Sequence, residues 1–284
     1  MGRHYLNNEL DVNYDRQAIA VAMGEEAEQE NTYQLFRVYL TPSMSFAFSK
    51  QQVVVKTRIS YAHQAYRQSR TGHLWVDPSI QWNWKVSALS SFSADVGYTN
   101  SPLTGKSIYD TPIFTTYRTQ KINQGKTAVT HDLRATATYK YANPVWGVFL
   151  NVSPMYARTS GNILYENVLN DRIFTIVATD KKRATETTGL SGHISKTFGW
   201  AKTLLGLGAS FTTTDYCMLV TGKVNVARMT VTSVALNFSL RPTRLLSVEG
   251  RSSVSFNQQK NQTAPQLSSG STNDWEHRLN IHVF

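Results

Sequence analysis

Apolar and polar residues alternate along a long stretch from Leu74 to Tyr98. Over residues 74–87 the even positions are apolar and the odd positions are polar, with Trp75 as the one exception. The alternation resumes at Phe92 after a break at residues 88–89. Successive side chains of a β-strand point to opposite faces of the sheet. The stretch therefore predicts a long antiparallel hairpin with one apolar and one polar face.

The same alternation predicts further strands along the whole chain. They are expected at residues 5–14, 35–48, 53–61, 133–141, 148–156, 188–198, 202–214, 246–256 and 275–283, with one more run that ends at Leu240. The parity of that last run slips near Arg228, which predicts a β-bulge. Together with the hairpin, these runs predict an all-β, antiparallel fold of about 12 strands.

Short and long connections alternate between the expected strands. Short turns are expected at residues 49–52, 87–90, 142–145, 198–202 and 241–244. Long loops are expected at residues 15–32 (acidic, with a possible short helix over 17–29), 100–127, 159–187 (with a β-capable patch at 173–177) and 258–274. Outer-membrane β-barrels have short periplasmic turns and longer extracellular loops. A soluble β-sandwich has no reason to sort its loops in this way, so the pattern favours a transmembrane barrel.

The length of the expected strands supports a membrane barrel. Residues 35–48 and 74–87 give runs of about 14 residues, longer than the ~5–6 residues of a typical globular strand and enough to cross a bilayer at a tilt. Aromatic residues of the apolar parity gather toward strand ends, as in an interfacial girdle. They are Phe46, Phe48, Trp82, Trp84, Tyr139 and Tyr141. Each one alone is compatible with the core of a sandwich.

Composition and charge narrow the alternatives. The 284 residues are 41% hydrophobic but only 17% charged, and no apolar run approaches the ~18 residues of a membrane-spanning helix. The single Cys217 excludes an internal disulfide framework. The formal net charge is +10, but its only cluster is residues 181–183 and the other basic residues share the polar positions with aspartates. We therefore expect a mixed lumen lining and no nucleic-acid partner.

Several segments of the chain resemble a barrel family of Bacteroidetes, the TonB-dependent-receptor-like outer-membrane proteins. The segments are Pro42–Phe46, Lys50-Gln51, Asp77–Lys85, Thr116–Thr119 and Tyr141–Pro144 with Phe149 and Asn151. The resemblance covers the chain from about residue 33 onward and implies a receptor with a plug and a barrel of about 22 strands. About 12 strands would then be the C-terminal part of the barrel. A smaller closed barrel is the alternative. Phe284 stands where the family carries its assembly signal, although its parity differs from that of Leu279 and Ile281.

No residue pattern points to catalysis or to a metal. Ser191 and His193 share one strand face, but the glycine spacing of a nucleophile elbow is absent around Ser191. The seven histidines, at positions 4, 63, 73, 131, 193, 277 and 282, lack ligand spacing. We expect no enzyme, no metal and no cofactor. Tyr109, Phe114 and Tyr117 are plausible ligand contacts in a loop, but loop packing is the simpler use, so we assign no site residue.

The sequence thus predicts that residues 1–284 form one outer-membrane β-barrel domain. Its expected role is the membrane-spanning wall and extracellular loops of a TonB-dependent-receptor-like transporter that binds and takes up a nutrient. The residues 1–5 do not begin a secretory signal, which suggests the C-terminal part of a longer protein. Expected partners are outer-membrane lipid and lipopolysaccharide, the barrel-assembly machinery through the C-terminal strand, and an inner-membrane energy-coupling complex if the full protein has a plug. The alternatives are a soluble all-β binding or adhesion module of the sugar-binding type, and an outer-membrane enzyme.

Overall fold

The computed structural model describes most of the chain as a single large sheet. The described residues are 3–21, 29–66, 69–102, 113–122, 129–170, 173–199, 202–220, 222–243, 245–261 and 270–283. They form sixteen strands and no α-helix. Twelve strands are long, with 13 to 19 residues each. The long strands are β1 (Arg3–Val21), β2 (Gln29–Ala47), β3 (Gln51–Tyr66), β4 (Ser69–Lys85), β5 (Ser90–Pro102), β8 (Val129–Asn143), β9 (Val148–Gly161), β12 (Arg183–Phe198), β13 (Thr203–Val220), β14 (Lys223–Leu240), β15 (Leu246–Asn261) and β16 (Gly270–Val283).

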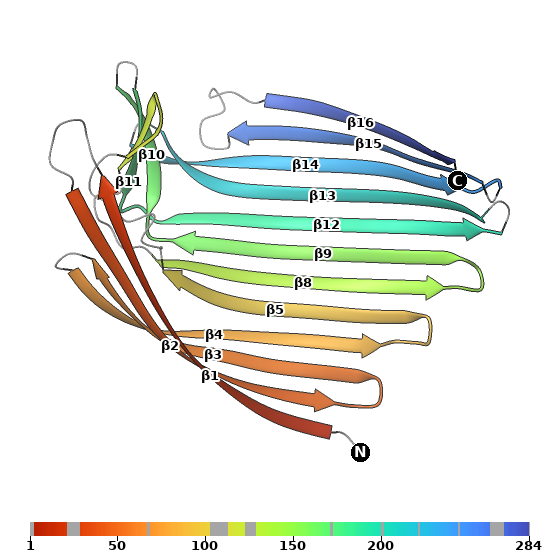
Figure 1. Cartoon of the computed structure of the whole chain (residues 1–284), viewed down its shortest axis with the longest axis horizontal. Helices are drawn as coiled ribbons and strands as arrows, with labels where there is room; N and C mark the ends of the chain where they lie inside the picture. Colours follow the sequence, from red (N-terminus) through yellow and green to blue (C-terminus); the bar gives the residue numbers. More distant parts are fainter. Residues whose placement is uncertain are drawn as a thin grey trace.

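The long strands follow one another up and down in chain order, and each pairs antiparallel with the next (Figure 1). The expected short turns are confirmed as the connections β2–β3, β4–β5, β8–β9, β12–β13 and β14–β15. These connections lie together at the right-hand end of Figure 1, where both chain termini also lie. We call this the short-turn end and the opposite end the long-loop end.

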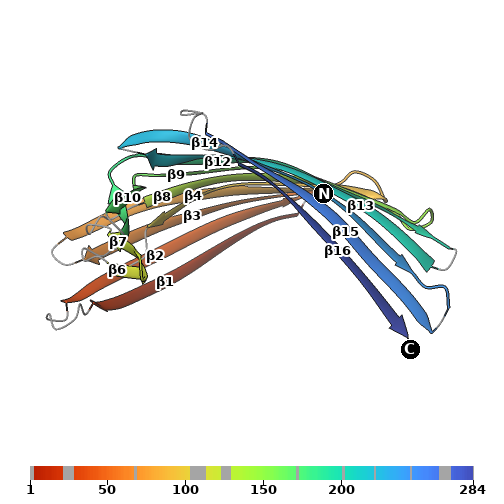
Figure 2. The same ribbon diagram turned by 90° about the horizontal axis from the view of Figure 1, so that it is seen from above.

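The four short strands form an extension at the long-loop end. They are β6 (Ile113–Thr116), β7 (Thr119–Ile122), β10 (Leu164–Asn170) and β11 (Ile173–Thr179). The hairpins β6–β7 and β10–β11 join through a parallel pairing of β7 with β11, and β10 makes a single parallel pairing with β13. Figure 2 shows β6, β7 and β10 on the inner, concave side of the curved sheet.

The sheet is open and curved like part of a cylinder (Figure 2). Strand β1 pairs with β2 and strand β16 pairs with β15, and the described residues include no pairing between β1 and β16. The fold is therefore all-β and mostly antiparallel, as expected, but the sheet does not close into a barrel. No second sheet packs against it among the described strands, so the arrangement is not a sandwich.

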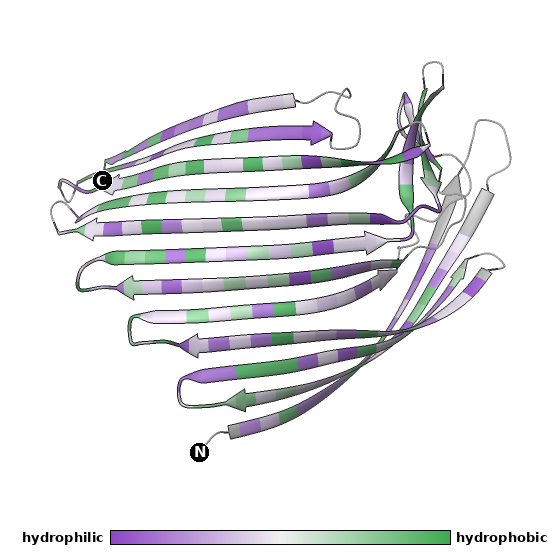
Figure 3. Cartoon of the chain, turned by 180° about the vertical axis from the view of Figure 1, so that it is seen from behind, coloured by the Kyte–Doolittle hydropathy of each residue, from purple (hydrophilic) through white to green (hydrophobic). Residues whose placement is uncertain are grey.

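Strand register places the apolar residues of neighbouring strands on one face. Leu10 pairs with Leu40, Leu40 pairs with Ile59, and Ile59 pairs with Val76. Farther along the sheet, Leu207 pairs with Leu236 in the same way. Because paired residues point to the same side, each strand adds to a continuous apolar face, while its other residues form a polar face. Figure 3 shows how hydrophobic and hydrophilic residues are interspersed along the strands.

The apolar face is the convex one, and it is exposed. On the long-loop half of β2 to β4, the side chains of the polar parity are covered, as in Tyr33 (1% exposed) and Trp75 (8%). The apolar-parity side chains beside them are open, as in Leu74 (70%) and Val76 (48%). Since the short strands lie on the concave side, covered side chains belong to the concave face. The convex face therefore presents apolar side chains to the surroundings.

Trp75, the exception to the alternation, has a structural explanation. It lies on the concave face, stacks on His73 with ring centroids 5.5 Å apart, and joins Tyr33, Leu35 and Ala62 in a buried cluster. The cluster lies where the concave face is covered, and there the polar parity needs an apolar side chain.

The structure corrects three details at the long-loop end. The expected helix over residues 17–29 is wrong for 17–21, which continue β1, while 22–28 lie outside the described residues. The expected loops 100–127 and 159–187 contain the short strands, and β11 contains the predicted patch at 173–177. The bulge expected near Arg228 is absent, because β14 keeps an unbroken register with both of its neighbours.

Candidate functional site on the concave face

A polar network lies where β4 and β5 separate, with Arg58 and Asp77 at concave positions of β3 and β4. The pairing of these strands ends at Ser79 and Gly97. Beyond this point the carboxylate of Asp77 on β4 accepts hydrogen bonds from the backbone N–H and the side-chain amide of Asn100 on β5, at 2.9 and 2.8 Å. The Arg58 guanidinium on β3 donates two more to Asp77, at 2.6 and 3.0 Å. The Asp77 side chain is only 4% exposed, so these donors replace the water it has lost.

The network continues across five strands. On β8, the His131 Nδ1 lies 2.5 Å from the Asn100 Oδ1, and its ring stacks on Tyr98. On β2, the Tyr39 ring lies 5.3 Å below the Arg58 guanidinium carbon and its hydroxyl accepts a hydrogen bond from Arg37. We interpret this network as a brace that holds the sheet where its ladder is interrupted. The sequence pattern placed Arg58 and Asp77 on the polar face but gave no signal for Asn100 or His131.

A row of hydroxyl groups crosses the middle of the concave face. Register and hydrogen bonds align one residue on each of six neighbouring strands, from β8 to β15: Thr138, Ser153, Ser191, Ser210, Ser233 and Ser255. The Ser210 and Ser233 hydroxyls are 2.7 Å apart, and those of Thr138 and Ser153 are 3.0 Å apart. This row is uncharged and hydrophilic, so it suits water or a neutral polar solute.

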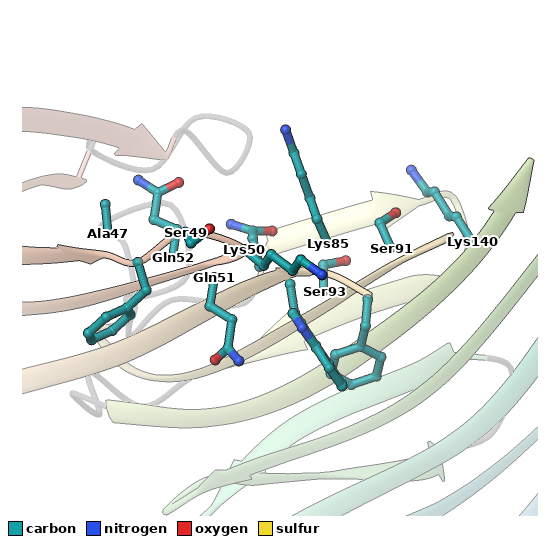
Figure 4. A pocket seen from close by; sticks show the side chains of 13 residues that line it. Ala47, Ser49, Lys50, Gln51, Gln52, Lys85, Ser91, Ser93 and Lys140 are labelled. Atoms are coloured by element: carbon teal, nitrogen blue, oxygen red, sulfur yellow. The ribbon is translucent and has the colours of Figure 1, made fainter. Parts of the chain in front are cut away.

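A basic hollow lies at the short-turn end of the concave face (Figure 4). It has a volume of about 510 Å³, and its lining includes the polar side chains of Lys50, Gln52, Asn83, Lys85, Ser91, Ser93 and Lys140. Figure 4 shows Lys85, Ser91 and Lys140 on the same side of the strands as Gln52, whereas Gln51 points to the opposite side. We call these seven residues the basic hollow.

The short strands carry the loop residues that were considered as ligand contacts. Phe114 (49% exposed) and Tyr117 (84% exposed) lie in and beside the β6–β7 hairpin, and the Arg118 guanidinium stacks on the Tyr117 ring. Tyr109 lies outside the described residues. The structure therefore does not gather these three residues into a described site.

A second, small cavity lies beneath the short strands. It measures about 190 Å³ and is lined by Tyr165 and Arg183, among others. The Lys121 Nζ lies 4.5 Å from the centre of the Tyr165 ring. Burial raises the pKa of the Tyr165 hydroxyl, and the positive charge of Arg183 opposes this shift. The phenol therefore remains protonated at neutral pH.

The two residues considered as a catalytic pair, Ser191 and His193, do not contact each other through a hydrogen bond. Ser191 and His193 share the concave face of β12, as their parity predicted. The Ser191 hydroxyl makes a hydrogen bond to the Ser153 carbonyl oxygen, and the His193 ring lies over Gly206 and Gly208 of β13. Among the described residues, no hydrogen bond joins Ser191 to His193, and no group of three or more His, Cys, Asp and Glu side chains is placed to hold a metal ion.

No helix in the described part of the chain has both the length and the apolar character required to span a bilayer. Comparison with known proteins gives no family model that matches the chain and no curated protein that is significantly similar to it.

Proposed function

We propose that the chain forms part of the wall of an outer-membrane β-barrel in a TonB-dependent-receptor-like transporter. The observation that carries this proposal is the exposed apolar face, which extends over all twelve long strands. An apolar patch of this extent on a soluble monomer would favour aggregation, whereas lipid is its natural solvent. The wall and its loops would serve nutrient binding and uptake in the outer membrane of a bacterial cell, without a catalytic role.

Charged residues limit the apolar face at the long-loop end. Five residues in consecutive register on the convex face form a charged row: Arg158, Glu186, Asp215, Arg228 and Lys260. The Arg158–Glu186 ion pair has a 3.3 Å contact, and Arg228 donates two hydrogen bonds of 2.7 Å to Asp215. Headgroups rather than acyl chains tolerate such a row. We take the charged row as the outer boundary of the lipid-exposed band.

The opposite boundary lies near Lys196 on the same face of β12. The Lys196 ammonium lies 5.2 Å from the centre of the Phe198 ring, an arrangement that suits a lysine at the membrane interface. Along β12, ten residues separate Glu186 from Lys196, which corresponds to about 34 Å of strand. With a strand tilt of about 45° the band is roughly 24 Å tall, close to the ~25 Å apolar band of outer-membrane barrels.

The open edges of the sheet determine what else the proposal requires. A lipid-embedded strand edge cannot remain unpaired, because each unsatisfied backbone group costs several kcal/mol in hydrocarbon. We propose that further strands complete the wall, so that the chain is part of a larger barrel. Pairing of β1 with β16 is the alternative, and it would be antiparallel because the two strands run in opposite directions. An inner-membrane energy-coupling complex is a partner only if the full protein also has a plug.

The decisive experiment compares the chain refolded in detergent, in lipid vesicles and in plain buffer. We expect β-rich circular dichroism only when detergent or lipid is present. A compact gel band that is lost on boiling would indicate that the chain closes by itself, and its absence from a folded sample would indicate an incomplete wall. A monodisperse β-rich protein in plain buffer would overturn the membrane proposal and favour the soluble binding module, for which the hydroxyl row is a suitable sugar-binding surface.

A further inference from the structure

The concave face is strongly asymmetric in charge. On β3 to β8, its short-turn end carries Lys50, Lys85 and Lys140, with Lys56 farther along β3. The nearest carboxylate on β5 is Asp95, four residues beyond Ser91 and thus about 13 Å away along the strand. Among the described residues, no ion pair or side-chain hydrogen bond engages the ammonium groups of Lys50, Lys85 and Lys140.

The two central lysines are placed by the strand register. Lys85 pairs with Ser91, and Ser91 pairs with Lys140, so the lysines flank this serine from the two neighbouring strands. Their backbones are two strand spacings apart, about 9.6 Å, a distance that two lysine side chains can close over one ligand. In the next row Gln52 pairs with Asn83 and Asn83 pairs with Ser93. The hollow thus combines ammonium, hydroxyl and amide donors on one side of the sheet.

Like charges at this distance repel each other when no counter-charge separates them. An anion that occupies the space between Lys85 and Lys140 would remove this repulsion. An electrostatic pattern of this kind therefore indicates an anionic ligand. The volume of about 510 Å³ lies within the 300–1,000 Å³ that is usual for small-molecule sites.

The type of cation distinguishes between anions. A planar carboxylate is best matched by the forked guanidinium of arginine, and no arginine lines the basic hollow. Lysine acts as a point charge that approaches a tetrahedral oxyanion from any side, as in phosphate-binding loops. Serine hydroxyls and amide N–H groups supply further donors to phosphate oxygens.

We propose that the basic hollow binds the phosphate groups of a small phosphorylated solute. Lys85 and Lys140 neutralise the phosphate charge, and Ser91 between them donates a hydrogen bond to a phosphate oxygen. The hollow opens on the polar face, opposite the apolar convex face, so a soluble phosphate ester reaches it and a membrane lipid does not. This inference goes beyond the proposed function and does not depend on closure of a barrel.

The test uses the full chain refolded in a non-ionic detergent and titrated calorimetrically with inorganic pyrophosphate at low salt. We expect saturable binding, a loss of affinity of at least about tenfold in the double variant Lys85→Gln/Lys140→Gln, and less than about twofold change in the control Lys223→Gln/Lys260→Gln, which removes the same charge far from the hollow. Equal loss in both variants, or no binding by the parent chain, would overturn the proposal.

A substitute variant and two competing ligands complete this test. If the double variant fails to fold, Ser91→Glu replaces it, because this carboxylate pairs with both lysines and should abolish pyrophosphate binding while it leaves the circular dichroism unchanged. Pyrophosphate binding retained in folded Ser91→Glu would overturn the proposal. Citrate is titrated as the carboxylate probe and anionic phospholipid in the micelle as the lipid probe. If either competes with pyrophosphate on equal terms, the assignment to a phosphorylated solute is wrong.

Discussion

At the scale of single residues, Asp77 shows how the sheet tolerates an interruption of its ladder. Beyond Ser79 the β4 backbone no longer pairs with β5, and the buried carboxylate of Asp77 takes over as the acceptor for the backbone N–H of Asn100. A buried charge is favourable only when its partners remain in place. The Arg58 guanidinium provides this partner on the other side of Asp77.

Replacement of this carboxylate should therefore be costly. We expect Asp77→Ala to lower the free energy of unfolding by about 2–3 kcal/mol, because it leaves buried donors of Asn100 and the Arg58 guanidinium without their acceptor. The measurement is urea unfolding of the refolded chain in detergent. The matched control is Asp95→Ala, an exposed carboxylate on the same face of β5, which should change stability by less than about 0.5 kcal/mol. A similar small effect at Asp77 would show that the network is not a brace.

Gly250 on β15 gives a second prediction at this scale. A Cβ atom added to Gly250 would overlap the Phe238 ring of β14, which covers this glycine. Gly250→Ala must displace the ring from its rotamer, at a cost of about 1–3 kcal/mol in the free energy of unfolding. Gly192→Ala on β12 is the control, since its nearest neighbour is 3.8 Å away. The companion Gly250→Ala/Phe238→Leu should recover stability, and if it does not, ring displacement is not the cause.

At the scale of strands, the alternation located all twelve long strands but not their ends. Between the charged row and Lys196, one face of each strand is apolar and the other polar, so the sequence alternates with a period of two. Outside the band the regular alternation stops, and the ladder continues without any periodic signal. This is why β1 extends to Val21 although its alternation ends at Tyr14. The short strands depend on the parallel pairing of β7 with β11, which no local pattern encodes.

The incorrect prediction of a bulge near Arg228 also arises where the alternation stops, at the charged row. Arg228 occupies an apolar-parity position, so the sequence reads there as a slip of register. In the structure the register is continuous and Arg228 forms its ion pair with Asp215, a residue of the charged row. Of the concave features, only the general polar character could be predicted, because the network and the basic hollow arise from side chains of four or five strands brought together by register.

The two faces of β4 should respond differently to one added charge. Ile80 is 50% exposed on the convex face, between Val55 and Val96 on its neighbouring strands. If this face contacts lipid, Ile80→Arg should cost about 2–4 kcal/mol near the bilayer midplane. Gln81→Arg, one residue away on the concave face, should cost less than about 1 kcal/mol. The measurement is reversible unfolding in lipid vesicles, and equal tolerance at both positions would contradict the membrane proposal.

At the scale of the whole molecule, the open edges of β1 and β16 separate a larger barrel from a small closed one. In a Cys217→Ser background, Asn7→Cys on β1 is combined in turn with Glu276→Cys, Arg278→Cys or Asn280→Cys on β16, three residues that sample the register of the concave face. If the wall needs further strands, none of these pairs should form a disulfide under mild oxidation in lipid vesicles, because the Cα atoms of a disulfide must lie within about 7 Å of each other.

The positive control for this cross-linking is Ser253→Cys with Glu276→Cys, two residues that are register partners on β15 and β16. This pair should oxidise in the folded chain and thereby show that concave-face cysteines are accessible to the oxidant. A disulfide between β1 and β16 in any register would mean that the edges pair with each other, since backbone groups of a lipid-embedded strand pair wherever a partner strand is available. The chain would then close on itself, and the larger barrel would have to be given up.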